Sequence, residues 1–84
     1  MKDIFLSYDL RNPGRNYEPL WAELKRFGGR RVLESLWEFP SDHSPAQLRE
    51  HFKRFIDGND GLMVMDVHDW AGARLISNPS TTAA

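Results

Sequence analysis

The chain has 84 residues, no cysteine and a formal net charge of −1 at pH 7. A chain this short forms one domain with a thin core, and the lack of cysteine excludes disulfides and thiolate metal sites as reinforcement. Apolar residues make up 40% and charged residues 27%, which excludes a wholly disordered chain, and no apolar run approaches the roughly 20 residues of a membrane span. We therefore expect a cytosolic protein, outside the membrane, that associates with itself.

The first part of the chain predicts a strand and a helix. Ile4–Tyr8 is short and apolar and is followed by a loop over residues 11–16 that contains the turn signal Pro13-Gly14. From Tyr17 onward, apolar residues recur at the spacing of one helical face: Leu20, Trp21, Leu24 and Phe27. Gly28-Gly29 then ends the predicted helix.

The stretch Arg30–Phe39 alternates in polarity, which predicts a strand or a hairpin bent near Ser35. One face of the alternation carries Leu33, Ser35, Trp37 and Phe39, and the other carries Val32, Glu34, Leu36 and Glu38. With Leu33 on its face, Trp37 reads more naturally as a core residue than as a platform for nucleic-acid bases.

The rest of the chain predicts a second helix and a last strand. Ser44 is a natural N-cap, with Pro45 at the first helical position and Gln47 completing a capping box. The apolar residues Leu48, Phe52, Phe55 and Ile56 follow on one helical face. Residues 57–61 form a turn, and Leu62–Val67 resumes strand character.

This order of elements predicts an α+β protein with a ferredoxin-like split βαβ sandwich, in which an antiparallel sheet carries two helices on one face. The sequence has no internal repeat. We expect residues 1–76 to form a single domain and residues 77–84, which are small and polar, to form a disordered tail.

Two segments, Ser7-Tyr8-Asp9-Leu10 and Arg31-Val32-Leu33-Glu34-Ser35-Leu36-Trp37-Glu38, resemble motifs of the CRISPR-associated Cas-two-like endonuclease family and its SinR-like and VapD-like relatives. The resemblance spans roughly residues 3–67 and implies a homodimer acting on RNA or double-stranded DNA in defence or toxin biology. It makes Asp9 the catalytic, magnesium-binding carboxylate, close to its symmetry mate. It also implies a nucleic-acid-binding role for Tyr8, Arg15, Arg31, Ser35 and Trp37.

Each of these residues can also be explained by a structural role or by solubility. Asp9 follows an apolar strand, where a carboxylate suits Mg²⁺, but an aspartate before Arg-Asn-Pro-Gly also starts turns. Arg11, Arg15, Arg30 and Arg31 flank the first helix, where they could hold phosphates, or simply keep the surface soluble. None of the three histidines makes a recognised metal-ligand spacing with another.

The sequence thus supports two hypotheses. The first is a Cas-two-like homodimer that binds nucleic acid and, with Mg²⁺ as cofactor, acts as an endonuclease. The second is a dimeric adaptor without catalytic activity that binds another protein, suggested by the acidic second half of the chain, where residues 32–84 carry four Lys and Arg against eight Asp and Glu.

Overall fold

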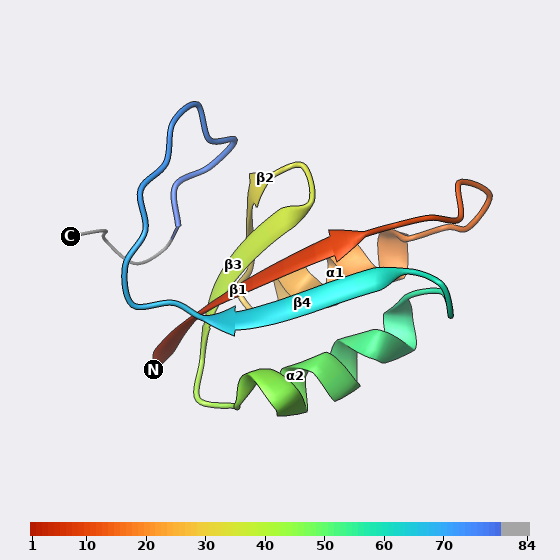
Figure 1. Ribbon diagram of the computed structural model, residues 1–84, viewed down its shortest axis with the longest axis horizontal. Helices are drawn as coiled ribbons and strands as arrows, with labels where there is room; N and C mark the ends of the chain where they lie inside the picture. The colour runs from red at the N-terminus through yellow and green to blue at the C-terminus, as the bar shows by residue number, and fades with distance from the viewer. Residues whose placement is uncertain (80–84) are drawn as a thin grey trace.

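The computed structural model describes residues 1–79. Its strands are β1 (Lys2–Asp9), β2 (Arg30–Leu33), β3 (Leu36–Ser41) and β4 (Gly61–Asp66). Its helices are α1 (Glu18–Arg26) and α2 (Pro45–Phe52), and a short 3₁₀ turn, η1 (Lys53–Phe55), extends the second. The strands form one antiparallel sheet in the order β2-β3-β1-β4 (Figure 1), so the predicted α+β class, with an antiparallel sheet and two helices, is confirmed.

Both helices pack on the same face of the sheet. Alternate residues of β1, namely Ile4, Leu6 and Tyr8, are buried in one cluster. The same cluster contains Leu20 and Leu24 of α1, Trp37 and Phe39 of β3, and Leu48 and Phe52 of α2. Since side chains alternate between the two faces of a strand, a single cluster of this composition requires both helices to cover one face.

The start of α2 is set by the predicted capping box. The Ser44 hydroxyl accepts a hydrogen bond from the Gln47 amide at 3.1 Å, and the Gln47 side chain accepts one from the Ser44 amide at 2.9 Å. The regular helix ends at Phe52, earlier than the apolar pattern indicated. Phe55 and Ile56 still pack against the core, because η1 continues the chain in the same direction in a tighter form.

Residues 30–41 form a hairpin with its turn at Glu34 and Ser35, in agreement with the predicted bend. The placement of Leu33 beside Trp37 was wrong. Arg31 is the residue that pairs with Trp37, and the register shifts between Arg31 and Leu33. This irregularity turns Leu33 away from the core and leaves it 43% exposed, because a shift of one residue moves a side chain to the other face.

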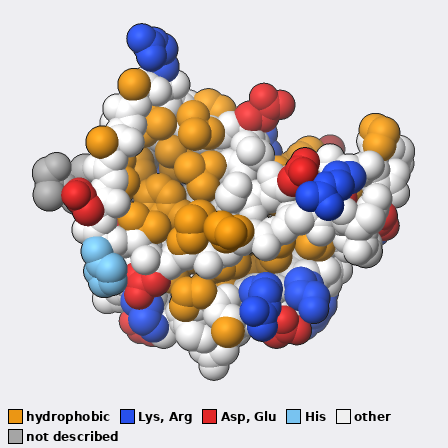
Figure 2. Space-filling view, in the orientation of Figure 1, with side chains coloured by type: hydrophobic (Ala, Val, Ile, Leu, Met, Phe, Trp, Pro, Cys, Tyr) orange, Lys and Arg blue, Asp and Glu red, His pale blue; other side chains and the backbone are white. Residues whose placement is uncertain are grey.

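The second face of the sheet has no helix on it. Phe5, Ser7 and Asp9 point to this side, and Met63 and Met65 of β4 lie opposite Ser7 and Phe5. Met63 is 63% exposed, and Figure 2 shows hydrophobic side chains gathered over the sheet. We call this side the open face.

The segment after β4 turns back toward the sheet. The Val67 amide donates a hydrogen bond to the Asp3 carbonyl of β1 at 2.9 Å, and the Ile76 amide donates one to the Val32 carbonyl of β2 at 2.8 Å, so the segment leads from β4 to β2 (Figure 1). Pro79 is buried, and residues 80–84 of the predicted disordered tail lie outside the described residues. Within residues 1–79, no helix is both long and apolar enough to cross a membrane.

Candidate functional site

A pocket of about 450 Å³ opens where β1 ends, between α1 and the turn of the β2–β3 hairpin. Its walls combine four of the residues singled out by the sequence motifs with three others: Tyr8, Asp9, Arg31 and Ser35, joined by Leu10, Trp21 and Glu34. The two motifs are more than 20 residues apart in the chain. The fold therefore brings the main elements of the predicted site to one place.

The Tyr8 hydroxyl organises this pocket. It accepts hydrogen bonds from the indole nitrogens of Trp21 at 3.0 Å and Trp37 at 3.1 Å, and it donates one to the Glu34 carbonyl at 3.2 Å. One oxygen atom thus connects β1, α1, β3 and the hairpin turn. Tyr8 consequently fixes the walls of the pocket and is itself buried beneath them.

Arg31 lies between two tryptophans. Its guanidinium carbon is 5.1 Å from the ring centre of Trp21 and 5.0 Å from that of Trp37, within the range of cation–π attraction. Every other Lys and Arg residue is exposed, whereas Arg31 is half-buried. Its buried Nε atom has no hydrogen-bond partner among residues 1–79.

A second pocket of about 370 Å³ adjoins the first, and Trp21 and Arg31 line both. Lys25, Gly29 and Trp37 complete its lining. Trp37 is only 2% exposed, and its indole nitrogen is bound to Tyr8, so it forms a wall of the pocket and cannot present a free ring face for base stacking. The burial of Trp37 agrees with the prediction that it is a core residue.

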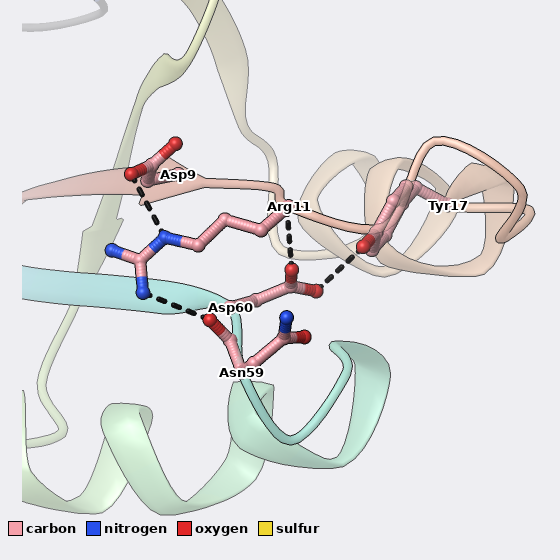
Figure 3. A network of polar contacts seen from close by, with 5 residues as sticks. All are labelled: Asp9, Arg11, Tyr17, Asn59 and Asp60. Atoms are coloured by element: carbon pink, nitrogen blue, oxygen red, sulfur yellow. Dashed lines mark hydrogen bonds and ion pairs between the residues drawn. The ribbon is translucent and has the colours of Figure 1, made fainter.

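Asp9 stands at the rim of the first pocket, on the open-face side of β1, with its side chain 69% exposed. Arg11 donates from Nε to the carboxylate at 3.1 Å and from Nη1 to the Asn59 carbonyl at 2.8 Å (Figure 3). Among the described residues, no group of three His, Cys, Asp or Glu side chains could hold a metal ion. The Asp9 carboxylate is thus already paired with an arginine within one copy of the chain.

The loop before α1 is tied to the loop before β4 through Asp60. Its carboxylate accepts hydrogen bonds from the Arg11 amide at 2.6 Å and the Tyr17 hydroxyl at 2.7 Å (Figure 3). It accepts a third from the Asp57 amide at 2.7 Å. Burial raises the pKa of Asp60, but these bonds outweigh burial and leave the pKa below its ordinary value. Arg15 pairs with Asp57 at 3.4 Å. Both loop arginines of the predicted site thus lie in a structural network beside the pocket.

Sequence reasoning missed the contribution of α1 to the site. Trp21 was predicted only as part of the apolar face of the first helix, and Lys25 was not among the predicted site residues. Both face the hairpin across the pockets, and no local pattern indicates this, because it depends on how α1 packs against β2 and β3.

Comparison with known proteins adds no family to this picture. No family model matches the chain, and no solved structure matches it.

Proposed function

We propose that the chain forms a homodimer that binds nucleic acid and, in the presence of Mg²⁺, hydrolyses phosphodiester bonds with the help of Asp9. The observation that carries this proposal is the shared pocket: Tyr8 and Asp9 from one motif and Arg31 and Ser35 from the other line it together. The order of elements and the strand order β2-β3-β1-β4 also support a ferredoxin-like split βαβ fold.

Dimerisation would use the open face. A chain of this size buries little apolar surface by itself, and the exposed Met63 lies on the side of the sheet that no helix covers. Asp9 has the same orientation along β1, so a twofold dimer through this face would put both Asp9 residues on the side of the interface.

Magnesium would be held by the two Asp9 carboxylates together with phosphate oxygens, each Asp9 exchanging its contact with Arg11 for one with the cation. The bound ion would polarise the phosphodiester and activate water. Arg31 would hold a phosphate oxygen in the pocket, because a guanidinium binds phosphate through paired hydrogen bonds.

The test combines two pairs of variants. Asp9→Asn should lower Mg²⁺-dependent cleavage of RNA or double-stranded DNA by more than about 100-fold, whereas Asp69→Asn, an equal charge change at an exposed position after β4, should leave it unchanged. Met63→Glu should convert the dimer to a folded monomer in analytical ultracentrifugation, and Lys53→Glu, at an exposed position of η1, should not.

Cleavage that persists in Asp9→Asn, or a wild-type chain that stays monomeric at high concentration, would refute the nuclease dimer. A dimer that neither binds nor cleaves RNA or DNA at millimolar Mg²⁺ would support the adaptor, in which a sheet edge or exposed aromatic residues contact another protein. The pairing of Asp9 with Arg11 is the observation that favours this second function.

A further inference from the structure

Two neighbouring pockets share Trp21 and Arg31 in their lining, and we call the pair the tryptophan groove. Its two parts, about 450 Å³ and 370 Å³, are each within the roughly 300–1,000 Å³ of sites for small molecules. Arg31 stands at their junction. A ligand in either part would therefore contact its guanidinium group.

Arg31 has unused binding capacity. Four other arginines have a carboxylate within 3.4 Å, namely Arg11, Arg15, Arg26 and Arg49. Arg31 is half-buried, its contacts with the rings of Trp21 and Trp37 occupy no N–H donor, and its Nε atom has no hydrogen-bond partner among residues 1–79. A partly desolvated guanidinium with free donors binds an anion strongly, and it matches the oxygens of a phosphate.

The groove also has a polarity. Lys25 adds positive charge to one pocket, Arg31 lines both, and the carboxylates of Asp9 and Glu34 supply acceptors in the other pocket. Between them lies the half-buried aromatic ring of Trp21. The fitting ligand carries a phosphate at one end, an apolar or aromatic body, and hydroxyl or amino donors at the other.

We propose that the tryptophan groove binds a nucleoside monophosphate, with the phosphate between Lys25 and Arg31 and the sugar or base donors directed to Asp9 and Glu34. A nucleoside monophosphate combines these three features in a molecule of the right size. This binding does not depend on dimerisation, on magnesium or on the cleavage proposed above.

The experiment follows the three indole N–H signals of the full chain by heteronuclear NMR during titration. Adenosine 5′-monophosphate should shift the signals of Trp21 and Trp37, and Trp70, which lies after β4 outside both pockets, serves as the internal reference. Adenosine and inorganic phosphate, each lacking one half of the ligand, should bind more weakly.

Matched variants assign the phosphate end. Arg31→Met should weaken binding of adenosine monophosphate by about tenfold or more, since a charge-assisted hydrogen bond is lost. Arg30→Met should leave binding unchanged, because Arg30 lies opposite Glu38 on the other side of β2. Lys25→Met, at an exposed helix position that does not endanger folding, should weaken binding about two- to fivefold.

The inference is overturned if millimolar adenosine monophosphate shifts neither Trp21 nor Trp37, if adenosine or phosphate alone binds as tightly, or if Arg30→Met weakens binding as much as Arg31→Met. Gel-shift assays with RNA and duplex DNA on the same preparation separate the two proposals. If the chain binds adenosine monophosphate but neither RNA nor duplex DNA, the nucleotide site is supported and the proposed function is refuted. If it binds RNA or DNA but not adenosine monophosphate, the nucleotide site is refuted and the proposed function stands.

Discussion

Replacing Tyr8 with phenylalanine removes one oxygen atom and leaves two indole N–H groups without their acceptor. The Trp37 indole is the more affected of the two, because that side chain is 2% exposed and water cannot reach it without a rearrangement. The Trp21 indole lines two pockets, so water can replace the hydroxyl there. The Glu34 carbonyl belongs to an exposed residue and can also be hydrated.

The expected cost follows from these environments. An unsatisfied buried donor such as the Trp37 indole costs about 1–3 kcal/mol, and the solvent-accessible bond to Trp21 contributes about 0.5–1 kcal/mol. Tyr8→Phe should therefore lower the free energy of unfolding by about 2–3 kcal/mol, which corresponds to roughly 10–20 °C in Tm for a domain of this size.

Urea denaturation followed by far-ultraviolet circular dichroism measures this cost. An unchanged m-value would show that the variant and the wild type expose the same surface on unfolding. In a Trp37→Phe background the cost of Tyr8→Phe should fall by about 1 kcal/mol or more, because the buried donor is already absent. A cost below about 0.5 kcal/mol in the wild-type background, or the same cost in both backgrounds, would refute the role assigned to the hydroxyl.

Two further predictions concern the packing of α1. The bonds from Arg26 lower the pKa of Glu23 to about 2 against the opposing effect of burial, and His51 adds a further bond. Since this pKa lies below its unfolded value, Glu23 stabilises the fold above about pH 5 and loses that contribution toward pH 2. The free energy of unfolding, measured in urea, should therefore fall less steeply with acidification in Glu23→Gln than in the wild type. An equal slope in the two proteins would contradict this role of Glu23. Gly29→Ala should cost about 2–3 kcal/mol in the same assay, because its Cβ would lie 2.5 Å from an α1 carbonyl oxygen. Gly28→Ala, with φ of +80° and no atom within 4 Å, should cost only about 1 kcal/mol, and equal costs would argue against the clash.

The sequence determined the features that depend on neighbours along the chain. The capping box of Ser44 and Gln47 spans four residues, and the end of the first helix follows from the two glycines after it. The apolar spacing of α1 identified its buried face correctly, because residues spaced by three and four share a face whatever the rest of the fold does.

The tertiary structure decided which of those faces meet and what lies between them. The register shift between Arg31 and Leu33 turned Leu33 away from Trp37 and left it exposed, a change of one residue that alternation alone could not reveal. The position of Arg31 between Trp21 and Trp37 arises from the packing of α1 on the hairpin. The candidate site therefore came from two motifs in the sequence, while its groove, its unpaired guanidinium and the pairing of Asp9 came from contacts between segments that only folding brings together.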